Sequence, residues 1–201
     1  MKPASQRVAS LRDRLREETG RAILDAAEEA FVREGLGARM EDIAARAGVA
    51  VGTLYNHFED REALVAALVR SRREALFGRL DAALAGVRDA GAAAQLRAYL
   101  GAVEEHARAH GPLLSALMQA GEGPAEARPS KTVLVDLVRR ADQIVARGVA
   151  AGELRPDAAR VFGLALVGMA RAVLVRAIEG GAAPGEPAAA IVDLFLRGAA
   201  R

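Results

Sequence analysis

The sequence of 201 residues contains no cysteine and no tryptophan, and aromatic residues make up only 3% of it. The missing cysteines exclude disulfides, cysteine-ligated zinc and thiol catalysis. Because hydrophobic residues still make up 52%, the core must be built largely of Ala, Leu and Val, which favours closely packed helices. Strand-like alternation, internal repeats, phosphate-binding glycine loops and nucleophile elbows are also missing. These absences predict an all-α protein and give no support for an enzyme or a bound cofactor.

The sequence also has no large excess of positive or negative charge. The net charge is only +2, and residues 1–58 carry equal numbers of basic and acidic side chains. Composition therefore gives no support for nucleic-acid binding, and any such function must come from geometry. The basic residues do crowd the first twenty-one positions. The start of the chain has no apolar segment of the kind found in signal peptides, which predicts a cytosolic protein.

The longest apolar stretch, residues 161–178, raises the question of a membrane span. Arg171 lies near its middle and Arg176 follows closely. Each arginine would cost roughly 2.5–3.5 kcal/mol at the centre of a bilayer. A helix that is buried on one side by its own domain and on the other by a partner subunit explains the pattern better.

Residues 40–64 predict two short helices joined by a tight turn. The first would bury Ile43, and Gly48 would end it in the left-handed conformation that glycine adopts without a steric penalty. The second has Leu54 and Phe58 four residues apart on one face. Two apolar faces across a glycine turn form the helix-turn-helix pattern, although a two-helix corner of an all-α enzyme would have the same local pattern.

These segments resemble the DNA-binding domain of the TetR (tetracycline-repressor-like) family of bacterial transcriptional regulators. The resemblance runs from about residue 21 to residue 68, with AILDAAEEAFVREG as the first helix, MEDIAARAG as the second and VGTLYNHF as the recognition helix. It implies an N-terminal three-helix DNA-binding domain and a C-terminal helical domain that binds a small-molecule effector and dimerises. Beyond residue 68 the resemblance concerns architecture only.

The organisation implied is an Arg-bearing N-terminal extension over residues 1–20, a helix-turn-helix DNA-binding domain over residues 21–66, and an effector-binding and dimerisation domain over residues 67–201. The implied function is a repressor that a small molecule releases from a near-palindromic DNA operator. The alternative is an all-α small-molecule-binding protein or enzyme whose helix-turn-helix is structural. The extension is either a solvated tail or an arm that lies along the DNA.

The recognition segment departs from the family pattern in several places. Arg39 precedes the second helix where a hydroxyl cap is usual, so Arg39 would contact phosphate instead. Ala50 replaces the usual Ser or Thr before the recognition helix, which would cost about 1 kcal/mol of capping. Val51 would meet a thymine methyl group or merely pack, and Arg61 stands where the family usually has a phosphate-contacting lysine. The expected DNA contacts are Arg39, Ala50, Val51, Gly52, Thr53, Tyr55, Asn56, His57 and Arg61, with Thr53, Asn56 and His57 facing outward.

The remainder predicts amphipathic helices. One would start at Asp60, a good N-cap, and run to about residue 85. The next would stop before Gly111 and Pro112, with a separate short helix after them. Another is predicted over residues 131–151, and in the last helix we expect Asp193 to pair with Arg197.

His106 and His110 are four residues apart, a spacing that can place two imidazoles on a metal ion. A polar helix end predicts the same composition, so no metal site is expected. The weak candidates for effector contacts are His106, His110, Met118, Met169 and Arg171. The expected homodimer interface lies on the last two helices, with Leu166, Val173, Ile191 and Phe195.

Overall fold

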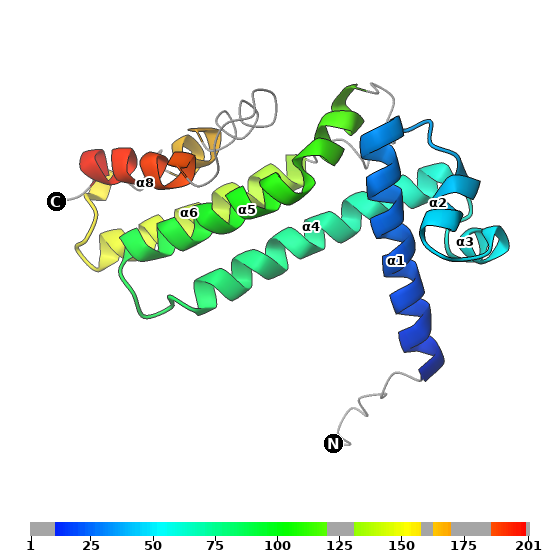
Figure 1. Cartoon of the computed structure of the whole chain (residues 1–201). Coiled ribbons are helices and arrows are strands. Elements are labelled where there is room, and N and C mark those ends of the chain that lie inside the picture. Colours follow the sequence, from blue (N-terminus) through cyan, green and yellow to red (C-terminus); the bar gives the residue numbers. More distant parts are fainter. Residues whose placement is uncertain (1–10, 120–130, 158–162, 170–185, 200–201) are drawn as a thin grey trace, which may run out of the picture.

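The computed structural model describes residues 11–119, 131–157, 163–169 and 186–199, and no strand occurs in these ranges (Figure 1). The all-α prediction is therefore confirmed. Residues 163–169 are helical. The labelled helices are α1 (Leu11–Glu34), α2 (Met40–Arg46), α3 (Val51–His57), α4 (Arg61–Ala85), α5 (Ala92–Gln119), α6 (Lys131–Ala150) and α8 (Glu186–Ala199).

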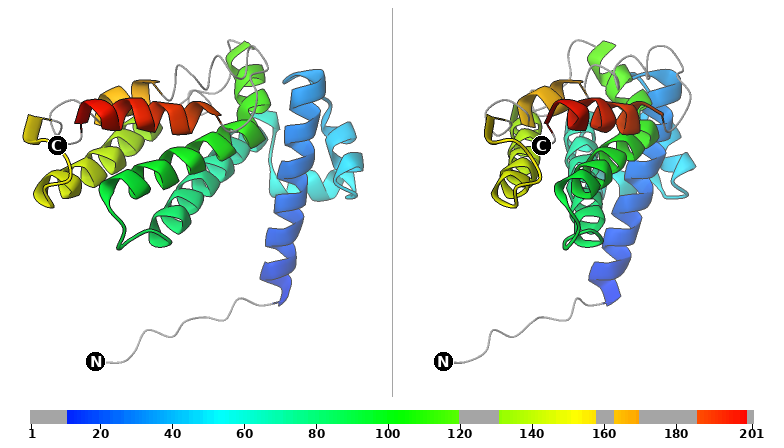
Figure 2. Two further views of the ribbon diagram at one scale, coloured as in Figure 1. Left: turned by 60° about the vertical axis from the view of Figure 1, so that its left-hand side comes forward. Right: turned by 90° about the vertical axis from the view of Figure 1, so that its left-hand side faces the viewer.

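The helices form two groups joined by α4. We call α1, α2, α3 and the first half of α4 the head, and the second half of α4 with α5, α6, residues 163–169 and α8 the body. In the body, α5 packs against α4, α6 and α8. In the head, α1 stands steeply across the end of the body and packs against α2, α4 and α5, while α3 packs on α2 (Figures 1 and 2).

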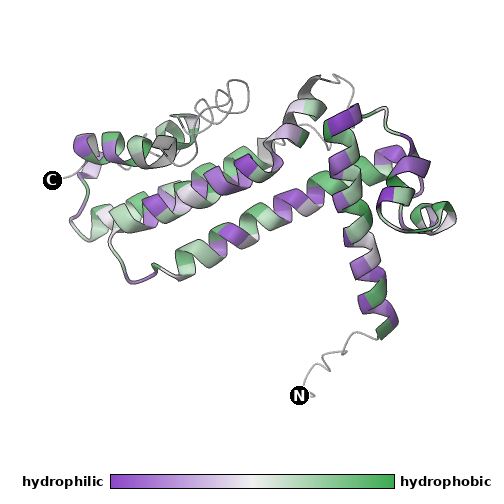
Figure 3. Ribbon diagram, viewed as in Figure 1, coloured by the Kyte–Doolittle hydropathy of each residue, from purple (hydrophilic) through white to green (hydrophobic). Residues whose placement is uncertain are grey.

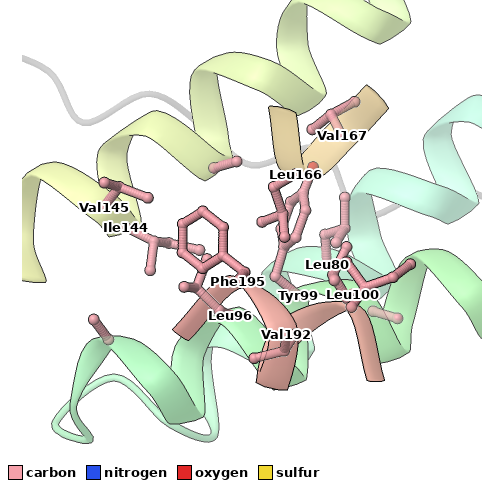
Figure 4. Packing of buried hydrophobic residues seen from close by; sticks show 14 of the residues in the cluster. Leu80, Leu96, Tyr99, Leu100, Ile144, Val145, Leu166, Val167, Val192 and Phe195 are labelled. Carbon is pink, nitrogen blue, oxygen red and sulfur yellow. The ribbon is translucent and has the colours of Figure 1, made fainter. Parts of the chain in front are cut away.

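Each group has its own apolar core, and along the helices hydrophobic residues alternate with polar ones (Figure 3). The body core gathers Leu80, Leu96 and Tyr99 with Ile144 and Phe195 (Figure 4). Tyr99 is fully buried, and its hydroxyl donates a hydrogen bond of 3.0 Å to the backbone carbonyl of Leu137. Small and aliphatic side chains make up nearly all of both cores, as the low aromatic content predicts.

Helix α4 belongs to both cores. Leu64 and Leu68 are fully buried in the head core, whereas Leu76 and Leu80 are buried in the body core. The helix begins as predicted, because the side chain of Asp60 accepts a hydrogen bond of 2.7 Å from the backbone N–H of Ala63. One continuous helix is therefore packed into both cores and connects the head rigidly to the body.

The prediction that a helix ends before Gly111 and Pro112 is wrong. Helix α5 continues through Pro112 to Gln119, with a bend in this part of the helix (Figure 1). A proline removes one backbone hydrogen bond and clashes with the preceding turn, which explains a bend. Leu113 and Leu117 beyond it are buried in the head core, and their burial favours continued helix.

The predicted pair of Asp193 and Arg197 is also replaced. The carboxylate of Asp193 instead accepts a hydrogen bond of 2.9 Å from Arg97 on α5, which fastens α8 to α5. Within the described ranges, none of the helices has both the length and the apolar character needed to cross a membrane.

Candidate nucleic-acid interface

The head core fixes helix α3 through its inner side. Leu54 is fully buried and is the one residue of α3 that belongs to the core, where it joins Ile43 and Ala44 of α2. Gly48 ends α2 with a φ of +70°, as predicted, and the N–H of Val49 donates to the carbonyl of Ala44 at 3.0 Å. The turn is therefore fixed by backbone geometry and α3 by one anchored leucine.

The outer side of α3 is exposed. Val51 and Tyr55, four residues apart, expose 37% and 46% of their surface, and Gly52 and Asn56 are exposed beside them. An asparagine side chain can bond both polar edges of an adenine, and a tyrosine hydroxyl can bond a phosphate. A valine suits the methyl group of thymine, and a glycine allows a close approach. This surface has the groups that reading DNA requires.

His57 does not face outward with Asn56 as predicted. Its ring lies against α1, where a Cβ built on Gly20 would be 3.5 Å from Nδ1 of His57. Burial lowers the pKa of His57, and the charge of Arg16 lowers it further. Thr53 is half-buried as well. The outward side of α3 therefore consists of the valine, glycine, tyrosine and asparagine described above.

Arg61 has a structural task that the sequence did not reveal. Its guanidinium donates a hydrogen bond of 3.0 Å to the backbone carbonyl of Ala38, across the turn between α1 and α2. Its Nε is buried and has no hydrogen-bond partner among the described residues. The guanidinium thus holds the turn in place, and only its remaining N–H groups are available to a phosphate.

The expected lack of side-chain caps is confirmed at both short helices. Neither Arg39, before α2, nor Ala50, before α3, makes a side-chain cap hydrogen bond. The side chain of Arg39 is 72% exposed and lies 3.5 Å from the carboxylate of Glu41. Such an exposed pair is weak, so the guanidinium is free to turn towards another anion.

A polar cluster at the junction of head and body was not anticipated. Arg72 of α4 pairs with Asp25 and Glu28 of α1, at 2.6 Å in both cases. The second oxygen of Glu28 lies 2.8 Å from Nδ1 of His110 on α5. Side chains far apart in the sequence build this cluster, so no local motif could reveal it. It fastens α1 to both α4 and α5.

His106 lies next to this cluster and is only 7% exposed. Its ring centre is 4.7 Å from that of His110, which confirms that the two histidines share one helix face. Nδ1 of His106 is buried with no hydrogen-bond partner among the described residues. Burial lowers the pKa of His106 to about 4, with smaller contributions from His110, Arg79 and Arg72. The ring is therefore neutral at pH 7.

The other expected effector contacts are less informative. Met169 is half-buried and packs against the body core. The side chain of Met118 and the whole of Arg171 lie outside the described residues. In the part of the chain that the structure describes, no group of three or more metal-binding side chains comes together.

Three of the expected interface residues are buried inside the protein and do not lie on its surface. Leu166, Ile191 and Phe195 expose 0%, 8% and 4% and pack inside the body core of their own chain. The expectation that these three side chains are presented to a partner is therefore corrected, because each packs within its own chain. Val173 lies outside the described residues. The exposed leucines on the same two segments are Leu164 and Leu194, at 61% and 67%.

An open apolar groove of about 570 Å³ lies along α6 beside Leu164. Val135 is 62% exposed at this groove, so it and Leu164 are two large exposed apolar side chains at one site. The i, i+3 and i+4 spacing of the apolar residues of α6 could have predicted a second apolar edge. The lining residues are Leu134, Val135, Val138, Arg139, Asp142, Gln143, Ala146 and Leu164.

Comparison with known proteins agrees with this geometry. Residues 23–68 match the sequence model described as "Bacterial regulatory proteins, tetR family". No curated protein sequence matches the chain. The matched range covers α2, α3, the second half of α1 and the first part of α4, all of which belong to the head.

Solved structures match nearly the whole chain. One is native NalD of Pseudomonas aeruginosa, the secondary repressor of the MexAB-OprM multidrug efflux pump, at 25% identity and a TM-score of 0.65, covering 92% of this chain and 98% of NalD. A TetR-family regulator from Agrobacterium tumefaciens has 20% identity and a TM-score of 0.70, with 92% and 100% covered. The TetR-family regulator PfmR from Thermus thermophilus has 23% identity and a TM-score of 0.67, with 87% and 97% covered. The likeness extends through head and body alike.

Proposed function

The chain belongs to the TetR family of bacterial regulatory proteins, and on this premise we propose that it is a dimeric repressor that a small molecule releases from DNA. The chain is a DNA-binding transcriptional regulator, as the match of its head to the family indicates. NalD, a repressor, is similar over almost its whole length, which supports repression as the mode of action. The proposed role is regulatory rather than catalytic, and it would be carried out in the cytoplasm, where the operator lies.

The main support for this proposal is the exposed face of α3. Val51, Gly52, Tyr55 and Asn56 stand on a helix that Leu54 anchors to a closed core. Asn56 would read base edges, Tyr55 would bind phosphate, and Val51 would meet a thymine methyl group. Arg39, Ala50, Thr53, His57 and Arg61 surround this face; the arginines would add phosphate contacts, and His57 would support α3 from behind.

The domain limits follow from the same argument. The DNA-binding unit would extend from Leu11, because α1 runs without a break across residue 20. The effector-binding and dimerisation unit would begin within α4, at the point where its leucines pass from the head core to the body core. A single helix thus crosses the limit between residues 66 and 67 that the resemblance implies.

A dimer is needed because one short recognition helix offers little contact with DNA. Two such helices could enter successive major-groove faces, roughly 34–36 Å apart, and read a near-palindromic operator. We assign to the partner copy the exposed Leu164 and Leu194, together with Val135, which lines the groove beside Leu164. Burial of large exposed apolar side chains is the usual driving force for such an interface.

An effector would act through α4. His106 offers a buried nitrogen that has no hydrogen-bond partner among the described residues, and a polar ligand group could bond to it. His110 beside it binds Glu28 of α1, so a ligand here would meet the cluster that fastens the head to the body. A shift of α4 would change the separation of the two recognition helices. A coupling of about 1–3 kcal/mol would suffice, and it must be reciprocal.

The test is a gel shift with the DNA that lies upstream of the protein's own coding sequence. The proposal predicts a complex that survives an excess of random DNA and dissociates when an effector is added. A protein that binds this DNA no better than random DNA over a range of salt concentrations would contradict the proposal. In that case the alternative, a small-molecule-binding protein with a structural helix-turn-helix, would gain support.

A further inference from the structure

Helix α1 carries a basic stripe in line with its buried face. Residues three or four apart share one face of a helix. Ala27 and Ile23 are fully buried in the head core, and the same face continues through Gly20 to Arg16 and Arg12. The face therefore changes from apolar to basic where α1 leaves the rest of the head.

The neighbouring helix α3 fixes the direction in which this stripe points. Gly20 lies against the ring of His57, the last residue of α3, and the charge of Arg16 lowers the pKa of that ring. In both views of Figure 2 the N-terminal turns of α1 project beyond the contact with the other head helices. Arg16 and Arg12 thus extend from the end of the recognition helix, on the side of α1 that faces it.

Both arginines are exposed and available for binding. Among the described residues, no ion pair or hydrogen bond involves the side chain of Arg12 or Arg16. Their neighbours Glu17 and Glu18 lie more than a quarter turn away from the stripe, since each residue advances a helix by about 100°. Asp13 lies beside the stripe and has an interaction of its own.

We propose that Arg12 and Arg16 bind two further phosphates of the DNA backbone, beyond those that α3 and its flanking residues reach. A rise of about 1.5 Å per residue sets the two arginines roughly 6 Å apart along a rigid helix. Guanidinium groups bind phosphate oxygens in a bidentate manner. This inference rests on the proposed function and adds a second DNA-binding element to it, which contributes affinity but reads no sequence.

The test compares the full-length protein with Arg12→Gln/Arg16→Gln. The matched control is Arg14→Gln/Arg21→Gln, which removes the same charge from the opposite face of the same helix. Affinity for the upstream DNA is measured across a range of salt concentrations. For Arg12→Gln/Arg16→Gln we expect roughly a tenfold or larger loss of affinity and a salt slope lower by about 1.8 units per protomer. Random DNA should lose a similar factor. The control and an Arg12→Lys/Arg16→Lys variant should keep most of the affinity and slope.

Two results would overturn the inference. One is an unchanged salt slope in Arg12→Gln/Arg16→Gln; the other is an equal loss in the control, which would mean that only total charge matters. Equal melting temperatures of the variants would show that the fold is intact, which is expected because the substituted side chains are exposed. If the wild-type protein itself fails to bind its upstream DNA specifically, the proposed function fails. If the wild type binds and the slopes agree, only this inference fails.

Discussion

At the scale of single residues, His106 should make stability depend on pH. The usual histidine pKa of 6.5 applies to the unfolded chain, whereas burial lowers the pKa of the folded chain to about 4. Between these values the unfolded chain binds more protons, so stability is present at pH 7 and is lost as the pH falls through this window. From pH 7 to pH 5 we expect wild type to lose roughly 2 kcal/mol more than His106→Gln. Urea unfolding at both pH values measures this, and an equal loss in the variant would contradict it.

Arg72 holds the junction between head and body. The structure gives its guanidinium two carboxylate partners on α1, and its side chain is only 17% exposed. Replacement by Met keeps the stem but leaves Asp25 and Glu28 without their cation. We expect Arg72→Met to cost about 2–3 kcal/mol of unfolding free energy. The exposed neighbour Arg73 offers the control, since Arg73→Met should change stability by less than about 0.5 kcal/mol. Similar losses of unfolding free energy in both variants would show that the cluster around Arg72 does not stabilise the junction.

Sequence and structure agree best for residues whose role is local. Ile43 and Leu54 are buried and Gly48 has a positive φ, as predicted, because helical spacing and backbone sterics decide these features within a few residues. The sequence prediction and the structure disagree where a residue far away in the sequence determines the position of a side chain. Arg61 bonds the carbonyl of Ala38, and His57 turns towards Gly20. No pattern around either residue specifies that partner.

At the scale of helices, α5 and α6 meet through a glycine. A Cβ on Gly148 would come within 2.6 Å of the Cβ of Ala92 and 2.9 Å of Leu154, which is closer than real contacts allow. We expect Gly148→Ala to cost roughly 1–3 kcal/mol through overpacking. Among the described residues, nothing lies within 4 Å of a Cβ added to Gly101 of α5, so Gly101→Ala should stabilise the protein by about 0.5–1 kcal/mol. Thermal unfolding measures both, and a neutral Gly148→Ala would show that the two helices can move apart freely.

Helix α5 shows why helix limits are harder to predict than helix existence. Gly111 and Pro112 form a local stop signal, which predicts a helix end at this point. The burial of Leu113 and Leu117 in the head core outweighs that signal, and the helix bends instead of ending. The start of α4 was predictable because Asp60 caps it within three residues. The limits set by local chemistry were predicted, and the limit set by tertiary packing was not.

At the scale of the whole molecule, the proposed dimer depends on exposed leucines of the body. Leu164→Asp and Leu194→Asp place a charge on the surface assigned to the partner copy and should convert dimers to monomers. Among the described leucines outside that surface, Leu11 is the most exposed, at 70%, so Leu11→Asp is the control and should leave dimers intact. Sedimentation velocity distinguishes the species. An unchanged sedimentation coefficient in both test variants would move the interface to another surface.

Whether the outer face of α3 reads DNA is tested by the ratio of the dissociation constants for upstream and random DNA of equal length. Asn56→Ala should reduce that ratio by a factor corresponding to roughly 1–3 kcal/mol, because its contact with a base edge is specific. Tyr55→Ala should weaken binding to both DNAs by a similar factor and leave the ratio unchanged. An Asn56→Ala protein that discriminates as well as the wild type, with Tyr55→Ala binding at full strength, would show that this face does not read DNA.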